Sequence, residues 1–189
     1  RSFGPLLART FGYDNDGRIT QITEGTRQTK FTYNADGRLA KVTNPLQQTT
    51  KFSYNQAGRR TQKTLPDGRT VQFGYDETGN RTKVVPPGRP AHTFAYDGQD
   101  QLTRYSPPAV GGVQMPTDYH YNAVGELTKV DYPDGATLKR TFDKAGRLAK
   151  TTAPSATRNY SYANKTGQLS KITSPTDPDL SYSYDGSLR

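Results

Sequence analysis

The chain has 189 residues and a formal net charge of +9, from 26 Lys+Arg against 17 Asp+Glu. Leu, Ile, Val and Phe together number 30, about 16% of the chain, which excludes the large aliphatic core of a helical or α/β domain. The 13 Tyr and 26 Thr that accompany them favour strands over disorder. The absence of Cys excludes disulfides, thiolate metal sites and a thiol nucleophile. No apolar run approaches the ~20 residues of a membrane-spanning helix.

A short motif recurs along the chain at nearly constant spacing. It begins with an aromatic residue and continues in most copies with Asp or Asn and then Gly, as in YDNDGRIT and YNADGRLA. In chain order, complete copies begin at Tyr13, Tyr33, Tyr54, Tyr75, Tyr96, Tyr121, Phe142 and Tyr162, and a ninth starts at Tyr184. Only the fifth interval is stretched, by an insertion around residues 107–112. This period predicts a repeat array.

Each copy has the pattern of a β-hairpin. A further aromatic residue stands two positions before the motif aromatic in eight of nine copies, so both rings project from one face of a strand. The predicted repeat core is Phe31, Tyr33, Phe52, Tyr54, Phe73, Tyr75, Phe94, Tyr96, Tyr119, Tyr121, Phe142, Tyr160 and Tyr162. Asx and Gly then predict a tight turn. The predicted turn glycines are Gly17, Gly37, Gly58, Gly79, Gly125, Gly146 and Gly167.

The second strand of each hairpin carries two apolar positions three residues apart, such as Leu39 and Val42. This spacing does not fit strict alternation and requires a β-bulge or burial on both faces. The sequence therefore predicts an all-β array of 20–22-residue hairpins that forms a curved, spiralling sheet over residues 11–189, after a lead-in segment at residues 1–10. Because the chain opens on Arg1 rather than Met, we expect it to be part of a longer polypeptide.

Groups suited to catalysis or metal binding do not converge in this sequence. His92 and His120 lie in different repeats, without a fixed partner. The segment from Asp14 to Gly17 resembles the start of a calcium loop, but Gly25 occupies the place of the bidentate Glu, which favours an Asx turn. We predict no catalytic residue, no metal site and no cofactor. The alternating rings suit a core better than a nucleic-acid stacking platform, so no specific nucleic-acid partner is expected.

Cationic side chains recur at two motif positions, and stacked repeats would align each set in a stripe. The stripe eight residues after the aromatic comprises Lys41, Lys83, Arg104, Lys129, Lys150 and Lys171. A second set, five residues after the aromatic, comprises Arg18, Arg38, Arg59 and Arg147. Such a surface could contact anionic cargo, glycans or lipid headgroups. The alternative, which exposed strands favour, is a solvated face with cross-strand pairing and edge protection.

The repeats resemble the YD-repeats of the Rhs and teneurin family. The pattern YDxxGRLTxxxxPxG matches from Tyr33 to Pro45, from Tyr54 to Gly68 and from Tyr121 to Gly135. The resemblance implies a large hollow β-shell built from a spiralling strip of hairpins. In bacterial Rhs proteins and the C component of Tc toxin complexes that shell encloses a toxic C-terminal domain, and in teneurins a similar barrel serves cell-surface adhesion. The protease segment that ends the bacterial shells is not matched by Asp177-Pro178-Asp179, which we interpret as a turn.

The resemblance implies a non-catalytic structural segment of a shell that encapsulates a toxin for delivery. The implied partners are the remainder of the shell polypeptide, its C-terminal toxin cargo and a secretion or delivery partner, and the implied location is secreted or cell surface. The open sheet edges also predict self-association. The alternative is a teneurin-like adhesion or glycan-binding module. An enzyme would require a convergent acid, base or metal site, which the sequence does not show.

Overall fold

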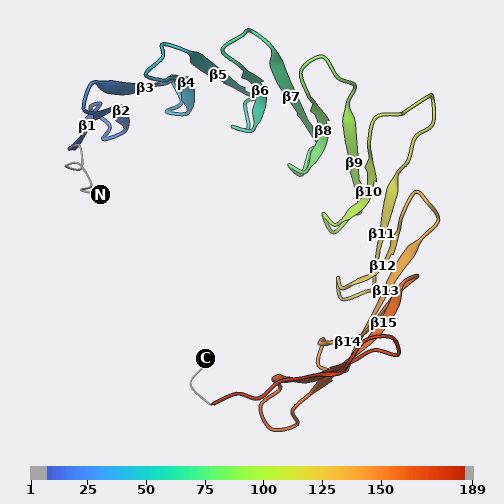
Figure 1. Cartoon of the computed structure of the whole chain (residues 1–189). Coiled ribbons are helices and arrows are strands. Elements are labelled where there is room, and N and C mark those ends of the chain that lie inside the picture. Colours follow the sequence, from blue (N-terminus) through green and yellow to red (C-terminus); the bar gives the residue numbers. More distant parts are fainter. Residues whose placement is uncertain (1–7, 186–189) are drawn as a thin grey trace, which may run out of the picture. The chain divides into compact units, whose positions relative to one another are not determined.

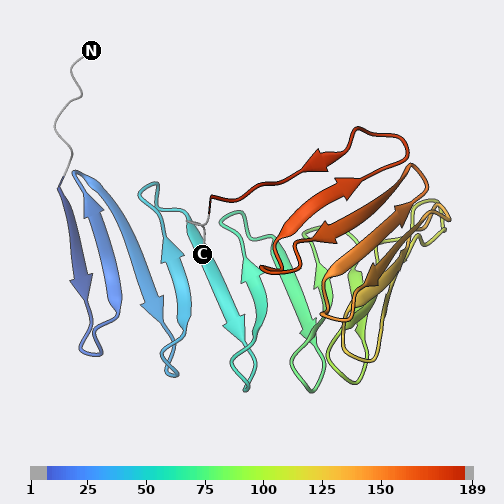
Figure 2. The same ribbon diagram turned by 90° about the horizontal axis from the view of Figure 1, so that it is seen from below.

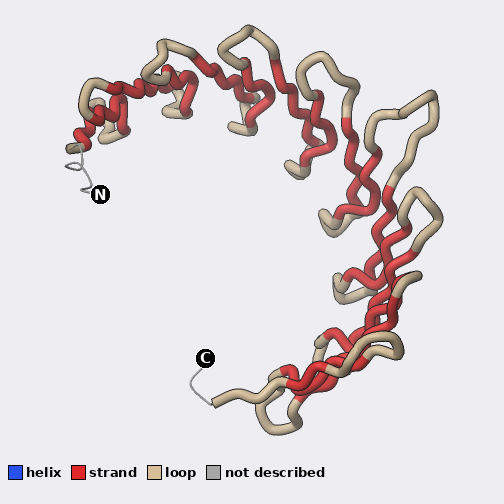
Figure 3. The backbone as a smooth tube through the Cα atoms, in the orientation of Figure 1, coloured by secondary structure: helices blue, strands red, loops and turns tan. Residues whose placement is uncertain are grey.

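The computed structural model describes residues 8–185, and these residues form β-strands joined by turns, with no helix among them (Figure 1, Figure 3). The part of the chain described here therefore contains no helix that could span a membrane. The chain divides into two compact units, residues 1–92 and 93–189. The predicted all-β array of hairpins is confirmed in both.

In the first unit each strand pairs antiparallel with the next strand along the chain. Figure 2 shows these strands, blue to green, as a row of alternating arrows. The strands are β1 (Arg9–Tyr13), β2 (Ile19–Glu24), β3 (Arg27–Tyr33), β4 (Leu39–Thr43), β5 (Thr49–Tyr54), β6 (Arg60–Thr64), β7 (Thr70–Tyr75) and β8 (Arg81–Val85).

The second unit continues the same antiparallel pairing from β9 onward. Its strands are β9 (His92–Tyr96), β10 (Leu102–Ser106), β11 (Thr117–Tyr121), β12 (Leu127–Asp131), β13 (Thr137–Phe142), β14 (Leu148–Ala153), β15 (Ala156–Tyr162), β16 (Leu169–Thr173) and β17 (Leu180–Ser181). The insertion between β10 and β11 turns on Gly111 and Gly112, and a bridge between Val110 and Val113 closes it.

The hairpin turns repeat one hydrogen-bond pattern. In the first, the Asp14 N–H donates to the Arg18 carbonyl (3.0 Å) and the Gly17 N–H donates to the Asp14 carbonyl (3.0 Å). The Asp14 carboxylate accepts the N–H groups of Asp16 (3.0 Å) and Arg18 (2.9 Å). Gly17 has φ 75°, a conformation that a Cβ disfavours. The other predicted turn glycines, Gly37, Gly58, Gly79, Gly125, Gly146 and Gly167, have φ between 70° and 110°.

The turn carboxylates are stabilised in their ionised form. A side-chain hydrogen bond from Arg147, followed by the Arg147 backbone N–H, lowers the pKa of Asp143. The backbone N–H of Arg18 is the main cause that lowers the pKa of Asp14, and the Arg18 side chain adds to it. Asn34 and Asn55 occupy the same turn position and accept the same backbone N–H bond without a charge.

A β-bulge follows the motif turn of each repeat. In the β3–β4 hairpin Tyr33 lies opposite Leu39 and Thr32 lies opposite Lys41, so Ala40 is the extra residue. Equivalent register shifts occur between β1 and β2, β5 and β6, β7 and β8, β9 and β10, β11 and β12, β13 and β14, and β15 and β16. The bulge explains why the apolar positions of the second strand are three residues apart.

In both units the core lies on one face of the β-sheet, which we call the aromatic face. All the predicted core rings on it are half-buried, and Val130, at 5% exposure, is the one buried hydrophobic residue among residues 8–185. Cations cover part of this face: the Arg60 guanidinium lies 4.5 Å from the ring centre of Phe52, and that of Arg81 lies 5.0 Å from Phe73. The core is therefore thin, as the composition predicts.

Two predicted boundaries fall at the ends of the described chain. Of the lead-in segment 1–10, residues 1–7 lie outside the described residues, and Arg9 and Thr10 already belong to β1. Of the ninth motif copy, Tyr184 and Asp185 are described, and residues 186–189 are not.

Replacing a turn glycine should cost far more stability than removing an exposed cation. Gly37→Val places a β-branched side chain at φ 75°, which costs roughly 1–2 kcal/mol or more, whereas Lys41→Ala should stay within about 0.5 kcal/mol. Gly98→Val is the matched control, because Gly98 has no left-handed φ and open space around it. Urea unfolding of the three variants checks this expectation, and equal midpoints for Gly37→Val and Lys41→Ala would contradict the turn assignment.

The turn carboxylates predict a loss of stability in acid. Because the folded pKa of Asp143 is below its unfolded value of about 3.9, the ionised group stabilises the fold above that pH, and this contribution disappears as pH falls through the folded pKa. Asp143→Asn should therefore have a lower thermal midpoint than the parent at about pH 7 and the same midpoint near pH 2. Glu77→Gln, in an exposed turn position, is the control. A constant difference between Asp143→Asn and the parent at all pH values would argue against this account.

Candidate functional site

Consecutive repeats are joined by the hydroxyl of the motif tyrosine. The Tyr33 hydroxyl donates to the Ile19 carbonyl (2.8 Å), and the Tyr54 hydroxyl donates to the Leu39 carbonyl (2.8 Å). The same bond runs from Tyr75 to Arg60 (2.9 Å), Tyr121 to Leu102 (3.0 Å), Tyr162 to Leu148 (2.9 Å) and Tyr184 to Leu169 (2.9 Å). In every case the acceptor is the first residue of the second strand in the preceding repeat, next to the bulge. We call this set of contacts the seam.

A second contact crosses the seam from the arginines that lie five residues after the motif aromatic. The Arg18 guanidinium lies 4.9 Å from the ring centre of Tyr33, and the Arg147 guanidinium lies 4.4 Å from that of Tyr162. Arg59 lies over Tyr75 at 5.4 Å and donates to the Asp76 carbonyl at 2.9 Å. Each of these arginines therefore packs on the tyrosine or the turn of the next repeat, and the long side chain holds the two hairpins together.

The turn glycines allow this close approach. A Cβ on Gly37 would lie 2.7 Å from a guanidinium nitrogen of Arg18, and one on Gly58 would lie 2.7 Å from Arg38. A Cβ on Gly125 would likewise meet the amide nitrogen of Gln101 at 2.8 Å. The seam therefore requires glycine for a second reason besides its positive φ.

One turn departs from this pattern. The fifth repeat has Asp100 at the glycine position, with φ 60°. Asp100 and Gln47 are the non-glycine residues with positive φ among residues 8–185.

The predicted basic stripe lies on the opposite face of the sheet from the rings, where the register places Lys41 beside Thr32 and Phe31 beside Val42. In the second unit the stripe residues Arg104, Lys129 and Lys171 form ion pairs with Asp118 (2.5 Å), Asp131 (2.7 Å) and Asp179 (2.8 Å), respectively. Lys41, Lys83 and Lys150 form no ion pair with any residue in 8–185. The sequence pattern did not distinguish these two groups.

These ion pairs stabilise the ionised form of two carboxylates in the second unit. The Arg104 side chain is the main cause that lowers the pKa of Asp118, and the Lys129 side chain is the main cause that lowers that of Asp131. The His120 Nε2 atom lies 2.8 Å from the same Asp131 carboxylate. Asp118 and Asp131 therefore each have a cationic partner on their own sheet face.

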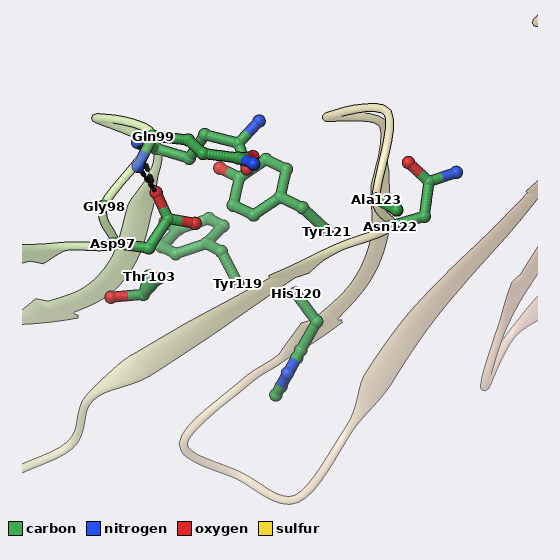
Figure 4. A pocket seen from close by; sticks show the side chains of 10 residues that line it. Asp97, Gly98, Gln99, Thr103, Tyr119, His120, Tyr121, Asn122 and Ala123 are labelled. Carbon is green, nitrogen blue, oxygen red and sulfur yellow. Dashed lines mark hydrogen bonds between the residues drawn. The ribbon is translucent and has the colours of Figure 1, made fainter.

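A hollow of about 530 Å³ lies at the stretched interval between the fifth and sixth repeats. Figure 4 shows the rings of Tyr119 and Tyr121 on one side of the strand and the His120 side chain pointing away from them. The Asp97 carboxylate accepts the N–H groups of Gln99 (2.9 Å) and Gln101 (3.0 Å), so it is engaged in its own turn. Within residues 8–185 no group of three or more His, Cys, Asp or Glu is arranged to hold a metal ion.

The repeat pattern of the sequence contains most of the seam residues but does not indicate their contacts. The arginines five residues after the motif aromatic follow the pattern of a charged surface stripe, and the pattern of rings alone assigns no role to the tyrosine hydroxyl. The preference for Tyr over Phe as the motif aromatic is a signal in the sequence, because a ring needed only for packing would not require a hydroxyl.

Comparison with known proteins agrees with this architecture. The sequence matches the teneurin YD-shell family over residues 3–189. No match was found among curated proteins. The fold is similar to that in a solved structure of the Photorhabdus luminescens Tc holotoxin pore carrying a TccC3 mutation, with a TM-score of 0.57 and 19% identity over 94% of this chain.

A crystal structure of a TcdB2-TccC3-Cdc42 complex also matches, with 15% identity over 95% of this chain, at a TM-score of 0.31 that carries no further argument. This chain spans 11% of the matched holotoxin chain and 15% of the matched TcdB2-TccC3-Cdc42 chain. At 19% identity the likeness to the holotoxin pore is one of fold. The repeats, the seam and the family match over residues 3–189 together show that the chain belongs to the teneurin YD-shell family, as a structural segment of such a shell.

Proposed function

We propose that this chain is a non-catalytic wall segment of a hollow shell that encloses a toxic C-terminal domain of the same polypeptide until delivery. The shell would act outside the producing cell, as a secreted or cell-surface protein with a delivery partner. The proposal is supported by the family match and by the fold likeness to the Tc holotoxin pore.

The seam is the observation that carries this proposal. A wall that retains a folded domain must not open between hairpins, yet the aromatic face buries little surface. Within each unit, the tyrosine bonds connect hairpins to their neighbours, and arginine contacts add to them, as with Tyr33 and Arg18. In contrast, the carboxylates of Asp97, Asp118 and Asp131 are engaged in a turn or in ion pairs, which supports a structural rather than a catalytic role.

Protection of a downstream segment tests the enclosure. The full parent polypeptide, with its sequence after Arg189, is digested with a broad protease and followed by mass spectrometry. We expect the C-terminal segment to survive under native conditions and to be cleaved after mild unfolding. Rapid native cleavage of that segment while the repeats stay intact would contradict enclosure and would favour a display or adhesion role.

The seam also predicts a matched pair of single-oxygen variants. Tyr54→Phe removes the bond to Leu39 and should destabilise the 189-residue chain by about 0.5–1.5 kcal/mol. Phe142 is the one described motif aromatic without a hydroxyl, and its counterpart acceptor is the Leu127 carbonyl. Phe142→Tyr should therefore stabilise the chain, by up to about 1 kcal/mol. Equilibrium urea unfolding measures both, and an unchanged unfolding midpoint for Tyr54→Phe would show that the hydroxyl is not the linking group.

A further inference from the structure

Two repeats share an arrangement of three side chains that crosses the seam. In the first repeat the Asp14 Oδ1 atom accepts backbone N–H groups of its own turn, and the Oδ2 atom accepts the Nε–H of Arg18 at 2.8 Å. The same guanidinium lies 4.9 Å from the ring centre of Tyr33 in the next repeat. We call this arrangement the Asp–Arg–Tyr triad. The same contacts, at 2.8 Å and 4.4 Å, recur in a second set: Asp143, Arg147 and Tyr162.

The fifth and sixth repeats contain the two ends of such a triad without its centre. Asp97 stands directly after the motif aromatic, as the triad carboxylates do, and Tyr121 is the next motif tyrosine. The residue between them, where the triad has arginine, is Gln101. The Asp97 Oδ1 atom accepts two backbone N–H groups of its own turn. From the residues in 8–185, however, its Oδ2 atom accepts no hydrogen bond and its carboxylate forms no ion pair.

Gln101 does not replace the missing cation. Its side-chain amide is neutral, and it donates across the seam to the Gly125 carbonyl at 3.2 Å. Asp97 is exposed, whereas Asp14 and Asp143 are half-buried beside their arginines. The Asp97 carboxylate therefore lacks both the positive charge and the cover that arginine supplies in the triads.

A hollow lies where the arginine is missing. Asp97, Tyr119 and Tyr121 line the hollow of about 530 Å³ described above, and Figure 4 shows the two rings on the same side of their strand. This volume falls in the range of small-ligand sites, roughly 300–1,000 Å³. Burial raises the pKa of the Tyr121 hydroxyl, and the negative charge of Asp97 raises it further, so the carboxylate acts on this ring.

The triads indicate which ligand chemistry suits the hollow. A guanidinium is planar, so it can lie over a tyrosine ring while its N–H groups donate to a carboxylate at its edge. Arg18 makes both contacts in the first repeat. An ammonium is a compact point charge and has no flat face to lie on the ring.

We propose that the hollow between the fifth and sixth repeats binds a guanidinium group from outside the chain, in the place that arginine occupies in the triads. The guanidinium donates to the Asp97 Oδ2 atom and packs on the rings of Tyr121 and Tyr119. Two sources supply this chemistry: a small free guanidine, or an arginine side chain of another polypeptide. The site belongs to the second unit alone and does not depend on whether a shell encloses a downstream domain.

Butylguanidinium, which carries the guanidinium on a short aliphatic stem, is the probe. A nuclear magnetic resonance titration of the 189-residue chain gives its Kd and shows which tyrosine resonances shift. Asp97→Asn removes the charge and keeps the turn, because Asn34 and Asn55 accept the same backbone N–H in their own turns. Asp134→Asn, at an exposed turn position of the same unit, is the charge-matched control.

We expect the Tyr119 and Tyr121 resonances to shift on titration. Asp97→Asn should weaken binding by about threefold to fivefold, and Asp134→Asn should leave the Kd nearly unchanged. Gln101→Arg places the missing cation within the chain, so it should weaken binding by about tenfold or more and raise the urea unfolding midpoint. Circular dichroism confirms that the three variants remain folded.

Three results would overturn the proposal: no shift of Tyr119 or Tyr121 with butylguanidinium, equal losses in Asp97→Asn and Asp134→Asn, or butylammonium binding as tightly as butylguanidinium. The last result would mean that any cation suffices. A peptide arm then separates the two sources. Tighter binding of acetyl-Gly-Arg-Gly-amide than of butylguanidinium indicates an arginine side chain of a polypeptide, and equal or weaker binding indicates a free guanidine.

Discussion

The hydrogen bond from the motif tyrosine to a backbone carbonyl of the preceding repeat is the contact on which this structure depends. A single-layer sheet with one buried hydrophobic residue among residues 8–185 cannot rely on a deep core. The bulge after each motif turn disrupts the strand ladder, and the tyrosine hydroxyl of the next repeat donates to a carbonyl at that place, as Tyr33 does to Ile19. The repeat unit is therefore complete only when its neighbour is present.

The local features of the fold could be predicted from the sequence because they rest on contacts within one hairpin. The alternation of Phe31 and Tyr33 fixes a face, the turn chemistry of Asn34 and Gly37 fixes a reversal, and the spacing of Leu39 and Val42 requires the bulge that the structure contains. The period of the motif then predicts how many hairpins follow.

The contacts between repeats could not be predicted in the same way, since they join residues about 15 positions apart whose partners depend on register. Arg18 and Arg147 belong to a column of cations in the sequence, and nothing local shows that their guanidinium groups lie over Tyr33 and Tyr162. The difference between the paired and unpaired lysines also needs the sheet register, because Lys41 and Lys51 become neighbours only through strand pairing.

The acceptor in the seam is a main-chain atom, and this has a consequence for how such a wall can evolve. Ile19, Leu39 and Arg60 serve equally well as acceptors, although their side chains have nothing in common. Cohesion is then insensitive to mutation at half of each contact, so repeats can drift apart or be duplicated without a compensating change in their neighbours. A strip of hairpins built in this way can keep its architecture at 19% identity to another protein of the same fold.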